Sequence, residues 1–235
     1  PMVVRFNGGA QAGHTVTKRV TSGSKIAHIF SHFGAGTLRG APTILTKDFI
    51  VNPRVLLVEY SQLVAMHCMP KLFVDHRSIV TTPYDVMLNR AAEISRRNGN
   101  SHHGSVGIGI NETVERNLSG PMLTVRDLFL SRDRAIRILD EIKTEWVQKR
   151  AIALGINPTY LSLSLVGSIN DDSSHIVDSL IAALRLDGIE VVNTNTLLFG
   201  SLVFEGAQGL ALDQNSSDFP HVTRSNTGTK NVISF

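Results

Sequence analysis

Two short stretches of the sequence combine closely spaced glycines with isolated polar side chains. Residues 204–213, FEGAQGLALD, follow an apolar run and place two glycines beside the amide of Gln208. Residues 6–15, FNGGAQAGHT, have the same character, with Gln11 and His14 among three glycines. Glycines let a ligand approach the backbone closely, and an amide both donates and accepts hydrogen bonds. Together the two stretches indicate a polar ligand site, although each alone also fits an ordinary strand-to-loop turn.

Two further segments carry polar groups at regular intervals. Residues 98–111 are polar, with glycines at positions 104, 107 and 109 among small and hydroxyl-bearing residues. Loops of this kind supply backbone N–H groups to anions, and a flexible surface loop is the alternative. Residues 219–227, FPHVTRSNT, gather hydroxyl groups, one guanidinium group and one amide.

Segments with the patterns of strands and helices alternate along the chain and must position these loops. Asn52 and Pro53 form a helix start, with asparagine as the N-cap and proline at the first helical position. Helices are predicted at residues 53–70, 83–97, 131–154 and 172–186, and strands at residues 2–6, 43–51, 71–80, 160–166, 189–192 and 201–204. This alternation predicts an α/β fold with a mostly parallel central sheet flanked by helices, in one domain spanning residues 1–235.

The composition is that of an ordinary globular protein. The 235 residues are 42% apolar and 18% charged, and no apolar run is long enough to cross a membrane. A net charge of +3 permits phosphate-bearing substrates but does not indicate a nucleic-acid-binding surface. The single cysteine, Cys68, predicts a reducing, cytoplasmic location. The nine histidines show no zinc-binding spacing, so no metal ligand is predicted.

The glycine-rich stretches also resemble a known family. Residues 5–15 resemble the Gly-Gly-His-Asn-Ala-Gly-His-Thr loop of adenylosuccinate synthetases, and residues 204–213 resemble their Phe-Glu-Gly-Ala-Gln-Gly-x-x-Leu-Asp stretch. Residues 220–227 are similar to their Pro-x-Val-Thr-Ser-Ser-Asn-Thr segment. Shorter matches in the family's order lie at residues 48–53, 82–85, 107–109 and 125–128.

The resemblance implies a fold related to the P-loop NTPases and the activity of a purine-nucleotide ligase. In that family GTP or ATP phosphorylates the purine 6-oxygen, and L-aspartate then displaces the phosphate to form a succinylamino purine. The reaction needs a base, a group that stabilises the transferring phosphoryl group, and Mg²⁺ bridging the phosphates. The implied partners are a purine nucleoside monophosphate, L-aspartate, the triphosphate and a second copy of the chain in a homodimer, with no nucleic acid and no membrane.

The matching positions imply roles for individual residues. His14 matches the catalytic histidine that stabilises the phosphoryl group or donates a proton to it, and Gln208 matches the glutamine at the purine 6-position. Leu212 matches a leucine of the nucleotide pocket, and Thr223 a threonine that holds the 5′-phosphate. Gln11 stands at a nucleotide-binding position where the family usually has asparagine.

Three further positions are implied nucleotide ligands. Ser105 and Gly107 fall where the family has a Thr-Thr-Gly loop for the 5′-phosphate. Arg116 fits the arginine that reaches the nucleotide bound by the partner subunit, with two residues missing before it. Without the resemblance, a structural role is the simpler interpretation of each.

Departures from the family pattern indicate a subtype. Ser216, Ser217, Asp218 and Phe219 replace the family's His-Gly-Thr-Tyr, which is more similar to the short synthetases of viruses and archaea. Some phage enzymes condense aspartate with dGMP instead of IMP, in which case the location is the host cytoplasm. The sequence has no Gly-x-x-Gly-x-Gly-Lys loop, so we expect a fragment of a longer synthetase that is inactive alone, or a truncated paralogue that only binds nucleotides. A structural protein reusing the fold is the third possibility.

Overall fold

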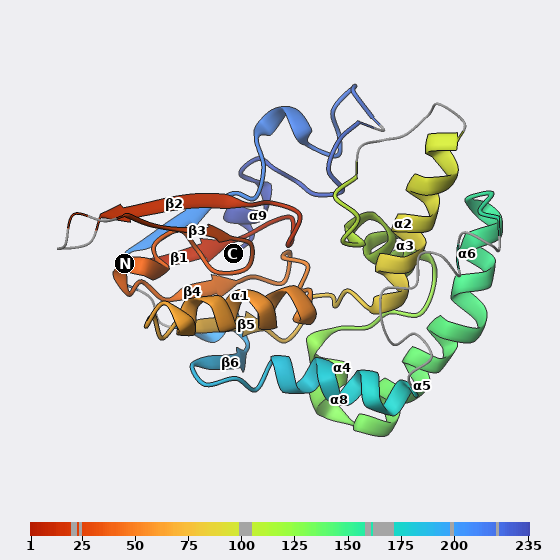
Figure 1. Ribbon diagram of the computed structural model, residues 1–235, viewed down its shortest axis with the longest axis horizontal. Coiled ribbons are helices and arrows are strands. Elements are labelled where there is room, and N and C mark those ends of the chain that lie inside the picture. Colours follow the sequence, from red (N-terminus) through yellow and green to blue (C-terminus); the bar gives the residue numbers. More distant parts are fainter. Residues whose placement is uncertain are drawn as a thin grey trace.

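A parallel β-sheet forms one half of the molecule, and a group of helices forms the other (Figure 1). The structure is a computed structural model that describes residues 1–19, 23, 25–98, 105–157, 161, 172–197, 200–219 and 221–235. The two chain ends both lie in the half that contains the sheet (Figure 1). This architecture confirms the expected mostly parallel sheet flanked by helices.

The main sheet of the described residues has five strands in the order β6-β5-β4-β1-β7, and all neighbours run parallel. The strands are β1 (Met2–Arg5), β4 (Thr43–Leu45), β5 (Leu72–Asp75), β6 (Ile189–Val192) and β7 (Leu202–Glu205). Each lies within or beside a segment predicted as a strand. The register pairs Arg5 of β1 with Glu205 of β7, so the two glycine-rich loops leave the same edge of the sheet.

An antiparallel hairpin, β2 (His14–Arg19) and β3 (Lys25–Phe30), extends from the first glycine-rich loop. In Figure 1 it lies along one side of the main sheet. The sequence did not predict β2, because Val16 is the one strongly apolar side chain in HTVTKR. Its residues alternate between exposed and half-buried, as expected for a strand with one face in solvent.

The helices are α1 (Pro53–Ala65), α2 (Pro83–Asn98), α3 (Ile110–Ser119), α4 (Val125–Leu130), α5 (Arg132–Glu141), α6 (Val147–Ala153), α8 (Ser173–Ala183) and α9 (Lys230–Ile233). The α1 start is confirmed, because the Asn52 side chain accepts a hydrogen bond from the N–H of Val55 at 3.3 Å. The helix predicted at residues 131–154 consists of α5, a π-helical stretch at Ile142–Trp146, and α6. Of the strand predicted at residues 160–166, the structure describes residue 161 alone, and that residue is helical.

Helices α3 and α4 were not predicted. The N-cap of α3 is Gly109, which has a φ of 88° and offers no side chain to signal a helix start. By contrast, Thr124 and Asp127 form a capping box at the start of α4. Both helices pack into the half of the molecule opposite the sheet (Figure 1).

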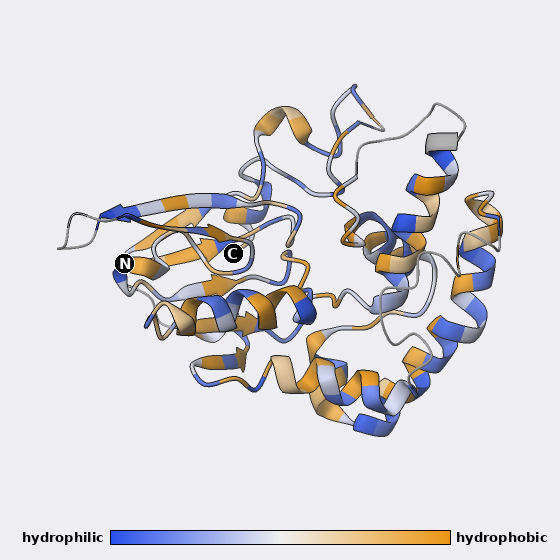
Figure 2. Cartoon of the chain, in the orientation of Figure 1, coloured by the Kyte–Doolittle hydropathy of each residue, from blue (hydrophilic) through white to orange (hydrophobic). Residues whose placement is uncertain are grey.

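One buried apolar cluster joins the sheet to the helices. It contains Leu45 and Val74 of the sheet, Leu56 of α1, Leu88 of α2 and Val177 of α8, all fully buried. Figure 2 shows the strands of the sheet mostly in the colours of hydrophobic residues, whereas the outer helices alternate between hydrophobic and hydrophilic. This cluster holds the sheet in a fixed position relative to α2 and α8. Within the described part of the chain, no helix is long and apolar enough to span a bilayer.

Candidate nucleotide-binding site

Three chain segments meet at the carboxyl edge of β1 and β7. The loop after β1 and the loop after β7 are joined by a hydrogen bond from the N–H of Ala207 to Oδ1 of Asn7, at 2.8 Å. The third segment, residues 221–227, joins them through Ser225, whose Oγ accepts from the N–H of Gly8 at 2.9 Å. The carboxyl ends of parallel strands are where open α/β sheets bind ligands. The residues predicted in the glycine-rich stretches therefore lie in the expected place.

The side-chain amide of Gln11 lies between two other predicted residues. Its Nε2 donates to Oε1 of Gln208 at 3.3 Å and to Oγ1 of Thr223 at 3.2 Å. Oε1 of Gln11 is buried and has no hydrogen-bond partner among the described residues. Because Thr223 accepts from Gln11, its own O–H hydrogen can be donated elsewhere. Gln11, Gln208 and Thr223 thus form one polar cluster with donors and acceptors to offer a ligand.

Gly8 and Gly9 allow the loops to approach this closely. Gly8 has a φ of 68°, and a Cβ there would lie 2.5 Å from Cβ of Ala207. A Cβ on Gly9 would lie 2.9 Å from the carbonyl oxygen of Ile50 and 2.7 Å from Cδ1 of Ile110. A side chain at Gly8 would push apart two segments that form the site, and one at Gly9 would push the loop after β1 away from Ile50 and from α3.

Replacing Gly8 with alanine is expected to lower the free energy of unfolding by about 1–3 kcal/mol, because the positive φ and the clash with Ala207 both carry a cost. Gly155→Ala is a matched control, since Gly155 has a φ of 61° and nothing within 4 Å of an added Cβ. Urea unfolding of both variants separates the cost of the positive φ, which both share, from the cost of the clash with Ala207, which only Gly8→Ala has. Equal losses in the two variants would mean that contact with Ala207 is not a constraint.

His14 is held by a carboxylate that was not assigned a role from the sequence. Its Nδ1 lies 2.6 Å from Oε1 of Glu205, and its Nε2 lies 3.4 Å from the carbonyl oxygen of Ala207. A carboxylate accepts, so Nδ1 carries the proton of this hydrogen bond. The other carboxylate oxygen of Glu205 accepts from the N–H of Ala35 at 2.9 Å. Glu205 therefore fixes the orientation and the tautomer of the His14 ring.

Arg5 is completely buried and lies next to Glu205, whose side chain also contacts His14. Its Nη1 is 3.4 Å from Oε1 of Glu205 and donates to the carbonyl oxygen of Phe33 at 3.2 Å. Burial lowers the pKa of Arg5, and the nearby carboxylates of Glu205 and Glu59 oppose that shift. The buried positive charge of Arg5 therefore lies directly beside the side chain that holds His14.

The segment at residues 221–227 is anchored to the loop after β7 through Asp213. Oδ1 of Asp213 accepts from the N–H of Asn215 at 2.9 Å, and Oδ2 accepts from the N–H of Thr227 at 2.7 Å. These backbone hydrogen bonds lower the pKa of Asp213. The N–H of Thr223 donates to the carbonyl oxygen of Leu212 at 2.9 Å. Thr223 and Leu212, both predicted from the sequence, are therefore neighbours, and the side chain of Leu212 is 40% exposed.

Ser105 and Gly107 lie in a loop that is held by α2. Oγ of Ser105 donates to Oδ1 of Asn89 at 3.0 Å and accepts from the N–H of Gly107 at 3.1 Å. Nε of Arg90 donates to the carbonyl oxygen of Gly107 at 2.9 Å. The loop leads into α3, whose Ile110 packs against Gly9 of the main site. Within the described residues, no hydrogen bond joins Ser105 or Gly107 to Gln11, Gln208 or Thr223.

Arg116 differs from the expectation that it reaches the nucleotide of a partner subunit. Its side chain is 0% exposed, and its Nε and Nη2 donate to the carboxylate of Asp85 at 2.8 and 3.0 Å. Nη1 and Nη2 also donate to the carbonyl oxygens of Pro121 and Val80. All three nitrogens are thus used inside the protein. In this structure Arg116 joins α3 to α2 and does not face a ligand.

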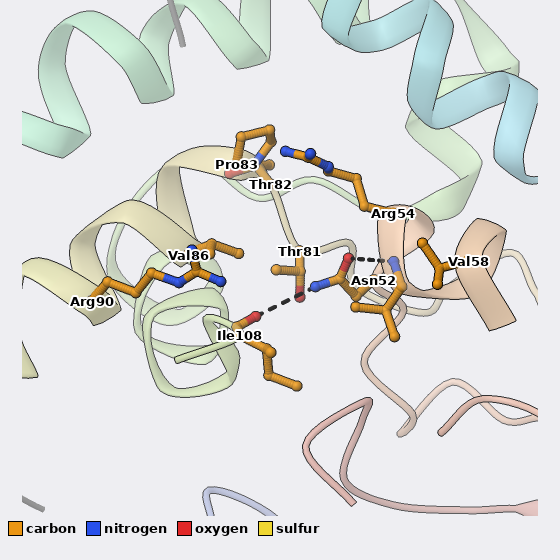
Figure 3. Close-up of a pocket in the computed structure, with 10 residues that line it drawn as sticks. Asn52, Arg54, Val58, Thr81, Thr82, Pro83, Val86, Arg90 and Ile108 are labelled. Atoms are coloured by element: carbon orange, nitrogen blue, oxygen red, sulfur yellow. Dashed lines mark hydrogen bonds between the residues drawn. The ribbon is translucent and has the colours of Figure 1, made fainter. Parts of the chain in front are cut away.

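A cavity of about 280 Å³ lies between the first turns of α1 and α2, beside the loop that contains Gly107 (Figure 3). Nδ2 of Asn52 donates across it to the carbonyl oxygen of Ile108 at 3.4 Å. None of the ligand residues predicted from the sequence lines it. The lining residues are Asn52, Arg54, Val55, Val58, Thr81, Thr82, Pro83, Val86, Arg90 and Ile108.

Comparison with known proteins agrees with this arrangement. A family model described as adenylosuccinate synthetase matches residues 1–234. The chain therefore belongs to the adenylosuccinate synthetase family, a family of ligases in purine biosynthesis. This finding confirms the resemblance drawn from the glycine-rich stretches.

Individual relatives show how much of such an enzyme the chain represents. It is 30% identical to the adenylosuccinate synthetase of Methylibium petroleiphilum over 233 residues, covering 95% of this chain and 49% of that protein. For the enzyme of Halobacterium salinarum the identity is also 30%, covering 96% and 50%. The chain thus spans about half the length of the curated relatives it matches.

Two solved structures share the fold. The fully ligated adenylosuccinate synthetase of Plasmodium falciparum superposes with a TM-score of 0.73 at 18% identity, covering 99% of this chain and 51% of that chain. The succinoaminodeoxyadenylate synthetase of cyanophage S-2L, bound to dGMP and to dATP as an energy donor, gives a TM-score of 0.54 at 17% identity, covering 100% and 51%.

Proposed function

We propose that the protein binds a purine nucleoside monophosphate at the carboxyl edge of β1 and β7. The observation that supports this most directly is the Gln11 amide, which contacts both Gln208 and Thr223. Gln208 is the residue we assign to the 6-position of the base, and Thr223 the residue we assign to the 5′-phosphate. The Thr223 hydroxyl can donate a hydrogen bond to an anion at this end. Leu212, which is 40% exposed, supplies an apolar surface beside Thr223.

We further propose that the bound purine is joined at C6 to L-aspartate through a 6-phosphoryl intermediate. His14 is the residue we assign to the phosphoryl group. Because Glu205 holds Nδ1, the nitrogen left to act on a phosphoryl oxygen is Nε2, which can donate a hydrogen bond or a proton when it is protonated. Glu205 and Arg5 are positioning residues in this proposal, since they act through His14.

The triphosphate and Mg²⁺ are assigned to no residue of this chain. Within the described ranges, no group of three or more His, Cys, Asp or Glu side chains is arranged to hold a metal ion. The 235 residues also contain no Gly-x-x-Gly-x-Gly-Lys loop to bind the triphosphate. The proposal for GTP or ATP, Mg²⁺ and a homodimer rests on family membership.

The monophosphate is proposed to be either IMP or dGMP. The departures at residues 216–219 favour the phage-type enzymes that use dGMP, whereas the curated relatives are named for the IMP reaction product. Thermal unfolding in the presence of each nucleotide tests both, because a ligand that binds only the folded state raises the midpoint. We expect one of the two to raise the midpoint at submillimolar concentration.

Matched variants test the assigned residues. Thr223→Val is expected to weaken monophosphate binding about tenfold, because a hydrogen bond to a charged phosphate is lost. Thr144→Val on the exposed face of the π-helical stretch is the control, and it should leave the dissociation constant unchanged. If neither IMP nor dGMP raises the unfolding midpoint, the proposed function is wrong.

A nucleotide-binding protein without catalysis is the second candidate, because the cluster of Gln11, Gln208 and Thr223 offers contacts for a monophosphate alone. It predicts the same monophosphate binding and the same loss in Thr223→Val. The two are distinguished by supplying aspartate, Mg²⁺ and GTP or ATP together with the bound monophosphate. Formation of a succinylamino purine supports the ligase, and binding without product supports the second candidate.

A further inference from the structure

Four side chains of alternating charge connect the segment at residues 221–227 to the helical half of the molecule. Nη1 of Arg224 donates to Oε1 of Glu115 on α3. Glu115 also lies 3.9 Å from Arg150 of α6, whose Nε donates to Glu112 at 2.7 Å. The side chains of Arg224 and Glu115 are only 23% and 22% exposed. A partly shielded network restrains its members more than an isolated pair on an open surface.

Helix α3 is a rigid partner for Arg224. The buried pair of Arg116 and Asp85 fixes it to α2, and the pair of Glu112 and Arg150 fixes it to α6. Its first residue, Ile110, packs against Gly9 in the loop after β1. The position of Glu115 is therefore set by three neighbouring elements, and any segment bound to Glu115 is placed relative to all of them.

Arg224 directly follows Thr223, and the segment that contains both has no helix or strand. On the sheet side this segment is held through Ser225, which accepts from Gly8, and through Thr227, which donates to Asp213. On the helical side the pair of Arg224 and Glu115 holds it. Thr223 thus directly precedes residues that attach the segment to both halves of the molecule.

Arg224 has a side chain long enough to reach the carboxylate of Glu115 on α3. The ion pair of Arg224 and Glu115 has no net charge, so it adds little electrostatic attraction for an anionic ligand. Its effect is on the position of the backbone next to Thr223.

We propose that the ion pair between Arg224 and Glu115 positions Thr223 for the phosphate of the bound nucleotide. The inference rests on the proposed function, since it concerns affinity for a monophosphate. Arg224 and Glu115 act through Thr223 and are positioning residues. Without the ion pair the segment is no longer attached to α3, and Thr223 must be ordered when the nucleotide binds. The lost conformational entropy then weakens the binding of the nucleotide.

The test measures dissociation constants for IMP, dGMP and the corresponding nucleosides inosine and deoxyguanosine, using the whole protein and the variants Arg224→Ala, Glu115→Ala and the double variant. We expect each single variant to weaken monophosphate binding about fivefold and the double variant to bind no worse than the singles, because the two residues act as one unit. Nucleoside binding should change less than twofold, because nucleosides lack the phosphate that Thr223 holds. Arg224→Lys should restore most of the affinity.

Amide hydrogen exchange provides a readout that does not depend on the ligand. The N–H groups of Thr223, Ser225 and Thr227 are hydrogen-bonded within the segment and its anchors, and they should exchange faster in Arg224→Ala while exchange in α2 is unchanged. Arg132→Ala is the control, since Arg132 forms an exposed ion pair with Asp178 and neither residue belongs to the segment at residues 221–227. It should alter neither exchange at residues 223–227 nor monophosphate binding.

Other outcomes would overturn the inference. If Arg224→Ala weakens monophosphate binding and Glu115→Ala does not, Arg224 contacts the phosphate directly and the ion pair is not the cause. If neither variant changes exchange at residues 223–227, the pair does not restrain the segment. If the unmodified protein binds no monophosphate, the proposed function fails, and the exchange measurement still decides whether the pair positions Thr223.

Discussion

Arg116→Met is expected to lower the free energy of unfolding by about 3–5 kcal/mol, which is the cost of leaving a buried charge without its partner. Arg116 and Asp85 are both fully buried, and two hydrogen bonds of 2.8 and 3.0 Å join them. In the variant the carboxylate of Asp85 remains buried with no cation beside it. The carbonyl oxygens of Val80 and Pro121 also lose their donor. Urea unfolding at neutral pH measures the loss.

Two further variants test whether the loss in Arg116→Met comes from leaving Asp85 buried without a partner. Arg134→Met removes an arginine of α5 whose pair with Asp127 is exposed, and it should cost less than about 1 kcal/mol. The double variant Arg116→Met with Asp85→Asn should regain part of the loss, because no buried charge is left unpaired. A loss in Arg116→Met no greater than in Arg134→Met would show that Arg116 is not structural, and would restore it as a candidate nucleotide ligand.

Glu59→Gln is expected to destabilise the protein on the order of 3 kcal/mol at neutral pH. Glu59 of α1 is buried and accepts hydrogen bonds from the backbone N–H groups of Ser31, His32 and Phe33 at 2.7 to 3.3 Å. Burial alone would raise its pKa. The His28 and His32 side chains and the backbone donors outweigh burial and lower the pKa from 4.5 to about 2. This turn leads to Ala35, which donates to Glu205 of the candidate site.

The pKa shift of Glu59 also predicts how stability depends on pH. Because its pKa is lower in the folded state, the stabilisation is fully present above pH 4.5 and is lost as the pH falls towards about 2. The difference in unfolding free energy between the wild type and Glu59→Gln should therefore shrink over that interval. Asp178→Asn, at an exposed ion pair, serves as the control and should change stability little at any pH. A difference that stays constant between pH 7 and pH 3 would contradict the assigned charge.

The parts of the fold that were predictable are those with a strong local signal. Asn52 and Pro53 marked the start of α1, and the apolar runs marked β1 and β7, because capping and burial depend on neighbouring residues. The hairpin strand β2 and helix α3 were missed for the opposite reason. The β2 sequence lacks an apolar pattern, and α3 begins at Gly109, where packing against α2 replaces a capping side chain.

The candidate site was predictable to a different extent. Gln11, Gln208 and Thr223 were named from the resemblance, and the structure brings them into contact although about 200 residues separate the first from the others. The roles of Glu205 and Arg5 were not predictable, because they depend on the register between β1 and β7. The buried position of Arg116 depends on the distant Asp85 in the same way.

The pairing of β1 with β7 also determines when the site can form during synthesis. β1 precedes the other four strands of the sheet along the chain, so β1 can pair with β4, and β4 with β5, as soon as residues up to about 75 are available. Its other edge stays open until Leu202–Glu205 has been made, and contacts of such large sequence separation form slowly. During that time an apolar strand edge and the glycine-rich loop are unprotected, which is the condition under which chains aggregate or recruit chaperones. The candidate site is therefore among the last parts of this chain to assemble, because it needs the pairing of β1 with β7.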